Sequence, residues 1–113
     1  MLPKPNRLLR TEITKVMKYG RRCVLPELQL VYGREGTGVS RFAFIVSTAI
    51  DKRAVVRNRV RRLLREAVRR ALPNVKQGTD CVFIARRGIS NLDHKSVNGV
   101  VERLLTQARL MNA

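Results

Sequence analysis

One segment constrains the fold of this chain more than any other: residues 52–70, which read KRAVVRNRVRRLLREAVRR. Its apolar residues recur at steps of three and four, the spacing of one face of an α-helix. They are Val56, Val60, Leu63, Leu64, Ala67, Val68 and Ala71. The pattern predicts a long helix that starts after Asp51, a natural N-cap, ends near Leu72 before Pro73, and packs this face against a core.

The same helix would carry a high density of positive charge. Nine of its nineteen residues are Lys or Arg, and Glu66 is the one acid among them. Four arginines follow one another at steps of four, where like charges repel by about 0.2–0.5 kcal/mol per pair. They are Arg57, Arg61, Arg65 and Arg69, with Asn58 and Arg62 beside them. A solvated basic face is the simplest explanation, but the density favours a polyanion bound along the helix.

The whole chain shares this charge imbalance. It has 24 Lys and Arg against 8 Asp and Glu in 113 residues, a formal net charge of +16. Self-repulsion on this scale indicates an anionic partner, either a nucleic acid or an anionic membrane. Eighteen of the cations are arginine, whose planar guanidinium suits phosphates and base edges, so RNA or DNA is the better match.

Length and composition predict one domain that spans residues 1–113, with enough apolar residues, 44%, to bury a core. No apolar run approaches the length of about 18 residues that a membrane-spanning helix needs. Residues 1–10 also lack the apolar region of a signal peptide. We therefore expect no membrane partner and a cytoplasmic location.

Hydrophobic periodicity predicts three helices and three strands. They are residues 8–19 (helix), 23–32 (strand), 41–47 (strand), 52–72 (helix), 81–85 (strand) and 97–108 (helix). The order is α-β-β-α-β-α. A small mixed sheet with helices packed against it, an α+β fold with two layers, accommodates this order most simply.

The connecting residues refine this prediction. Thr11 is a plausible N-cap for the first helix, and Gly20 stands where that helix would end. Pro26 requires an edge or a bulge in the first strand. Residues 33–40 contain three glycines and predict a hairpin loop, and residues 1–7 are expected to be a flexible basic segment.

The clearest strand is residues 41–47, RFAFIVS. Alternation places Phe42, Phe44 and Val46 on one face and Ala43, Ile45 and Ser47 on the other. We expect the phenylalanines to pack under the basic helix and the second face to be more open. Aromatic strands also bind bases in RNA-recognition motifs, but a βαβ unit would have to precede this one, and residues 1–40 predict helix then strand.

The sequence has no cluster of acidic, histidine or cysteine residues at a spacing typical of a catalytic or metal-binding site. The acids fall singly at Glu12, Glu27, Glu35, Asp51, Glu66, Asp80, Asp93 and Glu102. Glycine-rich phosphate loops, HExxH and GxSxG motifs are absent. Cys23 and Cys81 are expected to be buried, reduced thiols, and His94 stands alone. We expect no catalytic residue, no metal ligand and no organic cofactor in this chain.

Residues 46–69 read VSTAIDKRAVVRNRVRRLLREAVR, with AVVRNRVRR at their centre. This segment resembles the signature of the bacterial ribonuclease P protein family. An Arg41-led strand, Asp80 before the third strand, and Ala85-Arg86-Arg87-Gly88 follow the order of that family. The resemblance extends over about residues 8–110.

The resemblance implies an α-β-β-α-β-α fold with an uncommon left-handed βαβ crossover. It also implies a role: the protein subunit of a ribonucleoprotein whose RNA, with bound Mg²⁺, cleaves the 5′ leader from precursor tRNA. The expected partners are the ribonuclease P RNA subunit and precursor tRNA, with no DNA.

Two sets of residues are expected to contact RNA on the strength of the resemblance. The helix would bind the RNA subunit through Lys52, Arg53, Arg57, Asn58, Arg59, Arg61, Arg62, Arg65 and Arg69. A cleft between sheet and first helix would bind the leader through Ile13, Met17, Ala43, Ile45 and Ser47. Family members usually carry phenylalanines on the first helix, where this chain has Ile13 and Met17, and often a Lys-Lys pair where it has Thr48 and Ala49.

Two other functions share the charge and size of this chain. A structural RNA-binding protein, such as a ribosomal component, would bind RNA without a part in catalysis. A DNA-binding module would lay the basic helix in a major groove.

Overall fold

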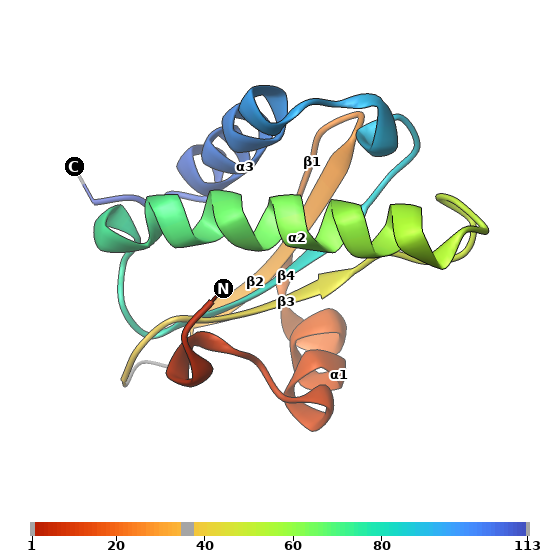
Figure 1. The fold of residues 1–113 in the computed structure, drawn as a ribbon. Coiled ribbons are helices and arrows are strands. Elements are labelled where there is room, and N and C mark those ends of the chain that lie inside the picture. The colour runs from red at the N-terminus through yellow and green to blue at the C-terminus, as the bar shows by residue number, and fades with distance from the viewer. Residues whose placement is uncertain (1, 35–37, 113) are drawn as a thin grey trace.

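The computed structural model describes residues 2–34 and 38–112. Within them lie three α-helices, four strands and three short 3-10 helices (Figure 1). The α-helices are α1 (Arg10–Tyr19), α2 (Ala54–Ala71) and α3 (His94–Gln107). The strands are β1 (Arg21–Val24), β2 (Leu28–Arg34), β3 (Arg41–Ile45) and β4 (Thr79–Ala85). The 3-10 helices are η1 (Lys4–Asn6), η2 (Leu72–Asn74) and η3 (Ile89–Asn91).

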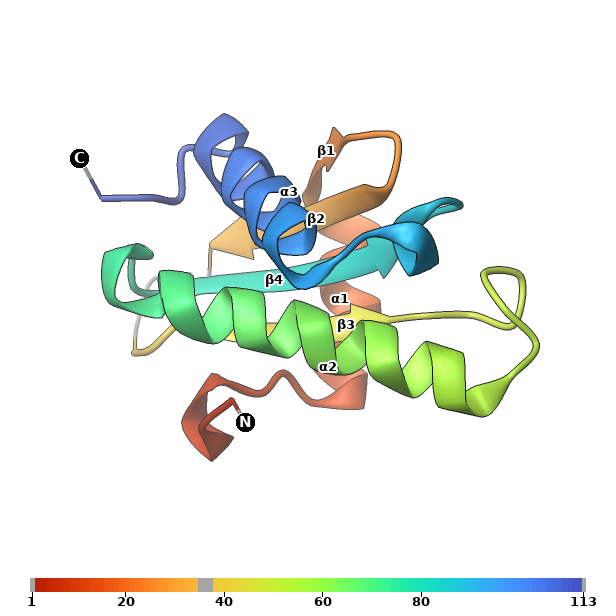
Figure 2. The ribbon, with the colours of Figure 1, turned by 45° about the horizontal axis from the view of Figure 1, so that its top comes forward.

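The strands form one mixed sheet in the order β1-β2-β4-β3. β4 is antiparallel to β2 and parallel to β3, so β3, α2 and β4 make a βαβ unit. With α2 in front and both strands running to the right, β4 lies above β3 (Figure 1 and Figure 2). This arrangement is a left-handed crossover, against the usual right-handed preference. The expected α+β fold with its uncommon crossover is confirmed.

The strand predicted at residues 23–32 is wrong in extent. Two strands, β1 and β2, occupy this stretch and pair as an antiparallel hairpin, with Arg22 opposite Val31. Pro26 lies in the turn between them, where its missing N–H removes no hydrogen bond from the sheet. The sheet therefore has one more strand than the sequence indicated.

The hairpin loop predicted at residues 33–40 is also wrong. Gly33 and Arg34 belong to β2, and β4 is inserted between β2 and β3, so these two strands do not pair. Residues 35–37 lie outside the described part of the chain. The glycines of this segment are compatible with a tight turn. They do not indicate that β4, which comes much later in the chain, lies between β2 and β3.

The sheet separates two helical layers. α2 and α3 cover one face and α1 lies on the other (Figure 2). Phe42 and Phe44 of β3 face α2 and α3, while Ala43 and Ile45 face α1, as the alternation predicted. The ring of Phe44 stacks on Phe83 of the neighbouring β4, with centroids 5.9 Å apart.

Gly20 ends α1, as the sequence predicted. A Cβ atom at this position would lie 2.5 Å from the carbonyl oxygen of Val16 and 2.9 Å from that of Tyr32. Glycine therefore allows the chain to pass from α1 into β1 against the neighbouring backbone. At the other end the prediction is wrong, because Leu9 is the N-cap and Thr11 lies inside the helix.

The N-terminal residues, expected to be flexible, have packing partners in the structure. Leu2 is 2% exposed and belongs to the core cluster under α2. The Leu8 N–H donates to the Phe42 carbonyl oxygen at 2.9 Å, and the Asn6 side-chain amide donates to the Ser40 carbonyl oxygen at 2.8 Å. These contacts place the segment along β3, where it covers the exposed edge of the sheet.

A charged cluster joins α1 to the sheet. Asp80 of β4 is 2% exposed and accepts two hydrogen bonds from Arg41, at 2.9 Å from Nε and 2.8 Å from Nη2. Arg41 lies opposite Asp80 in the parallel register and also pairs with Glu12 of α1. One guanidinium thus holds carboxylates from two elements, which fixes the position of α1 on the sheet.

We predict that Asp80→Asn lowers the free energy of unfolding by about 1.5–3 kcal/mol, because it removes the buried charge that Arg41 faces. Urea denaturation measures the change. Glu102→Gln, at an exposed position of α3, is the matched control and should stay within about 0.5 kcal/mol of the parent. Equal, small changes in both variants would show that the cluster does not hold the fold together.

Candidate nucleic-acid interface

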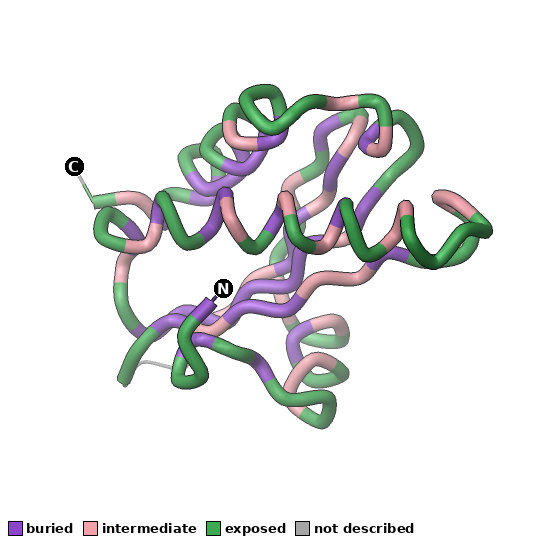
Figure 3. The backbone as a smooth tube through the Cα atoms, in the orientation of Figure 1, coloured by how far each residue is buried: buried purple, intermediate pink, exposed green. Residues whose placement is uncertain are grey.

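The apolar stripe of α2 determines which of its side chains face solvent. Figure 3 shows buried and exposed positions alternating along the helix. The buried residues are Val60, Leu64, Ala67, Val68 and Ala71. On the opposite side lies an exposed line of side chains, here called the outer row: Asn58, Arg62, Arg65 and Arg69. Their steps of four, three and four keep them on one helical face.

Two of the predicted RNA-binding arginines are half-buried and hold the segment before α2. Arg57 donates from Nη1 to the carbonyl oxygens of Asp51, at 3.0 Å, and of Lys52, at 2.8 Å. Arg61 donates to the Val46 carbonyl oxygen at 3.2 Å. These bonds tie residues 46–52 to the first turns of α2. Part of the positive charge that the sequence assigned to RNA contact therefore also fixes local structure.

Asp51 is not the N-cap of α2, contrary to the prediction. Arg53 holds that position, and Asp51, two residues earlier, accepts hydrogen bonds from the Arg53 side chain and backbone N–H. These bonds lower the pKa of Asp51 to about 2, so the pair stays charged at any pH well above that value. With no side-chain cap and no acid in its first turn, α2 presents its positive end near Lys52 and Arg53.

The remaining cations of the predicted set are exposed. Lys52, Arg53, Arg59, Arg62 and Arg65 are all exposed. Arg69 pairs with Glu66 at 3.2 Å while staying 51% exposed, and surface pairs of this kind contribute little. Of the nine residues predicted to bind RNA, the structure brings seven to the surface and leaves Arg57 and Arg61 half-buried.

The residues predicted to bind a leader lie on the other face of the sheet. Ile13 and Met17 of α1 and Ile45 of β3 are half-buried and pack together with a small apolar cluster. Ala43 is 8% exposed and lies beneath them, and Ser47 is exposed beyond the end of β3. The structure therefore gathers the first three and gives Ala43 a packing role.

One residue of this surface was missed from the sequence. Ile84 of β4 lies opposite Ile45 in the parallel register, is half-buried, and joins the same cluster. β4 is continuously apolar, so its sequence alone does not distinguish its two faces. The register with β3 would have identified Ile84. We call Ile13, Met17, Ile45 and Ile84 the apolar strip.

The described residues hold no cluster of three or more His, Cys, Asp or Glu side chains that could bind a metal ion. Cys81 is buried, and burial raises the pKa of its thiol, which opposes formation of a reactive thiolate. Cys23 is half-buried rather than fully buried, and neither cysteine is in a disulfide. His94 is exposed at the start of α3.

In the part of the chain that the structure describes, no helix has the length and apolar character needed to cross a membrane.

Comparison with known proteins identifies the family to which the chain belongs. The sequence model of the family described as Ribonuclease P matches residues 2–109. The chain belongs to the ribonuclease P protein family. It is 36% identical over 111 residues to the ribonuclease P protein component of Caldanaerobacter subterraneus subsp. tengcongensis, covering 97% of this chain and 95% of that protein.

Solved structures agree on the fold. The RNase P protein from Thermotoga maritima superposes with a TM-score of 0.82 at 25% identity, covering 89% of this chain and 96% of that one. The Staphylococcus aureus RNase P protein gives a TM-score of 0.86 at 20% identity, covering 96% of this chain and 100% of that one. At 20% identity the second match concerns the fold alone.

Family membership establishes the function. The chain is the protein subunit of a ribonucleoprotein endonuclease, in which the RNA subunit carries the catalysis. Its partners are that RNA and precursor tRNA, from which ribonuclease P removes the 5′ leader. The alternative of a structural, ribosome-associated protein has no support among the comparisons.

Proposed function

We propose that α2 is the surface on which this chain binds the ribonuclease P RNA subunit. The outer row is the observation that carries the proposal, because buried Val60, Leu64 and Val68 on the opposite side hold its cations toward solvent. Lys52, Arg53 and Arg59 extend the same positive surface. Each exposed guanidinium offers several donors to phosphate oxygens, and neutralising phosphates releases counterions from the RNA.

Three residues have more specific roles in this proposal. Asn58 stands in the outer row with both a donor and an acceptor, which suits a 2′-hydroxyl or a base edge. Its side-chain oxygen already accepts a hydrogen bond from Arg61 at 2.8 Å, which orients the amide. Arg57 and Arg61 each use part of their guanidinium N–H groups in hydrogen bonds to residues 46–52. The other N–H groups of these two side chains would contact RNA.

We also propose that the apolar strip contacts the 5′ leader of precursor tRNA, with Ser47 and the edge of Ala43 alongside it. Half-buried apolar side chains offer contact to unpaired bases. Ile13 and Met17 stand where the family usually has phenylalanines, so this contact would rely on apolar packing rather than on ring stacking.

Magnesium would be held by the RNA subunit and the substrate in this scheme. The described residues offer no cluster of carboxylates for it, and the acids of α1 and β4 nearest the strip, Glu12 and Asp80, are engaged by Arg41. We propose that the chain works as one domain in the cytoplasm, with Mg²⁺ reaching the reaction through RNA ligands.

The α2 proposal predicts the salt dependence of RNA binding. If about six phosphates are neutralised, log K against log[salt] should have a slope of roughly −4 to −5. Arg62→Ala/Arg65→Ala should flatten that slope by about 1.4–1.8, because two phosphate contacts are lost. Filter binding of the RNA subunit over a range of KCl concentrations measures both slopes.

The matched control removes two exposed cations from α3 instead, in Lys95→Ala/Arg103→Ala. This variant has the same net charge as the α2 variant, so a general charge effect would flatten both slopes equally. Equal flattening, or an unchanged slope in the α2 variant, would exclude the outer row as the RNA-binding surface.

The strip proposal predicts a difference between two substrates. Met17→Ala should weaken binding of the reconstituted holoenzyme to leader-bearing precursor tRNA by about fivefold, since it removes apolar contact area. Binding to mature tRNA, which has no leader, should not change. Thr14→Ala, at an exposed position of α1, is the control. A loss that is equal for precursor and mature tRNA would mean that Met17 acts through folding or RNA-subunit binding.

A further inference from the structure

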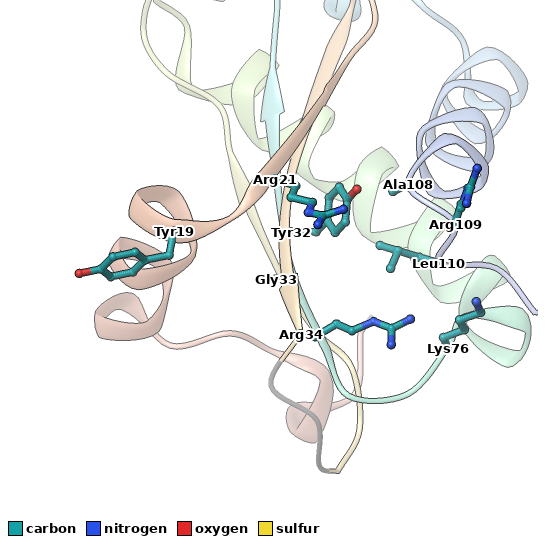
Figure 4. Close-up of a pocket in the computed structure, with 9 residues that line it drawn as sticks. All are labelled: Tyr19, Arg21, Tyr32, Gly33, Arg34, Lys76, Ala108, Arg109 and Leu110. Carbon is teal, nitrogen blue, oxygen red and sulfur yellow. The ribbon is translucent and has the colours of Figure 1, made fainter.

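A second basic surface lies away from both proposed contacts. A cavity of about 510 Å³ opens between the β1–β2 hairpin and the segment that follows α3 (Figure 4). Its charged lining residues are Arg21, Arg34, Lys76 and Arg109. Tyr32, Gly33, Ala108 and Leu110 complete the lining, and Tyr19 points away from the others (Figure 4).

The four cations have no protein partner within the described part of the chain. None of their side chains takes part in a hydrogen bond or ion pair there, whereas Arg41, Arg53 and Arg69 are each paired with a carboxylate. Arg34 extends from β2 toward Lys76, and Arg21 lies beside Tyr32, opposite it in the strand register (Figure 4). Unpaired cations around one concavity repel one another and favour a bound anion.

The backbone at Arg109 is a second, independent observation. α3 ends in a Schellman motif, in which the Leu110 N–H donates to the Leu105 carbonyl oxygen at 2.9 Å and the Arg109 N–H to that of Thr106 at 3.0 Å. The motif places Arg109 in the left-handed region with φ 59°, where glycine is the usual residue. Among the described residues, Arg109 is the one non-glycine with positive φ. A cation at a strained position that lines the cavity suggests that the charge matters there.

We propose that this cavity is a second RNA-binding site, which takes a backbone phosphate among its cations and the attached nucleotide against Tyr32. A volume of about 510 Å³ is within the range of nucleotide-sized ligand sites. Tyr32 is half-buried, so an exposed part of its ring can stack on or flank a base while the rest anchors it to the core.

The position of the cavity would give the subunit a further contact with its complex. Tyr32 packs with the α2–α3 side of the sheet, whereas the apolar strip lies on the α1 side. Lys76 follows η2 at the C-terminal end of α2, far along the helix from Lys52 and Arg53. The site does not depend on the α2 proposal, since none of its residues belongs to the outer row.

The test is Arg34→Ala/Lys76→Ala, which removes two side chains that make no hydrogen bond or ion pair with the described residues. Binding to the RNA subunit alone and binding of the reconstituted holoenzyme to precursor tRNA are measured over a range of KCl concentrations. A loss of about tenfold at low salt, with the salt slope flattened by about 1.4–1.8, is expected in one of the two assays. Loss in the first assay assigns the phosphate to the RNA subunit, and loss in the second alone assigns it to the substrate.

Arg109→Gly separates binding from folding. It should raise the melting temperature by a few degrees, because glycine relieves the positive φ, and yet weaken RNA binding by about threefold in the assay that Arg34→Ala/Lys76→Ala affects. Arg109→Lys keeps the charge and should bind as the parent does.

Wild-type binding of both RNAs by Arg34→Ala/Lys76→Ala would overturn the proposal, as would wild-type binding by Arg109→Gly. Arg62→Ala/Arg65→Ala in the same assays reports on α2 separately, so failure of either site is visible without the other. Lys95→Ala/Arg103→Ala again controls for net charge.

Discussion

The burial of the apolar stripe of α2 against the sheet and α3 is the constraint on which the rest of this structure depends. Burying one Val or Leu side chain contributes roughly 1.5–3 kcal/mol, and Val60, Leu64 and Val68 are all buried. Repulsion among four arginines at steps of four costs about 1 kcal/mol in total. Burial therefore prevails and fixes the rotation of the helix about its axis. The cations face outward because the opposite side cannot leave the core.

Because the sheet is a single layer, the protein has a different kind of surface on each side of it. One face supports α2 and α3, and with them the positive surface that suits structured RNA. The other carries α1 and the apolar strip, which suits an unpaired strand. The Asp80–Arg41–Glu12 cluster keeps α1 in register with β3 and β4, so Ile13 and Met17 stay beside Ile45 and Ile84. A subunit that assists an RNA catalyst needs such placement more than it needs reactive groups of its own.

Much of this was predictable because it is local. The helical period of residues 52–72 and the alternation of residues 41–47 depend on neighbours along the chain, and both predictions were right. The errors in the sheet concern contacts between distant segments, above all the insertion of β4 between β2 and β3. Pro26 predicts an edge or a bulge within one strand, but a proline fits equally well in the turn between two strands, where the structure has it.

The candidate site was predictable to the same degree. The sequence analysis singled out every arginine of α2 except Arg70, but it could not separate Arg57 and Arg61, which hold residues 46–52, from the exposed outer row. That difference depends on where the preceding loop folds back. Ile84 and the basic cavity escaped notice because strand register and the end of α3, not local pattern, bring their residues together.

Directed hydroxyl-radical probing from α2 tests the central claim most directly. An iron chelate attached to Val55→Cys, a 74% exposed position beside the outer row, should cut the RNA subunit at a few clustered sites in the reconstituted complex. The same chelate on Thr14→Cys, at an exposed position of α1 on the other side of the sheet, should give little cleavage, with Cys23→Ser as the background for both. Strong cleavage of the RNA subunit from α1 and none from α2 would contradict the account, because the RNA would then lie against the opposite face of the protein.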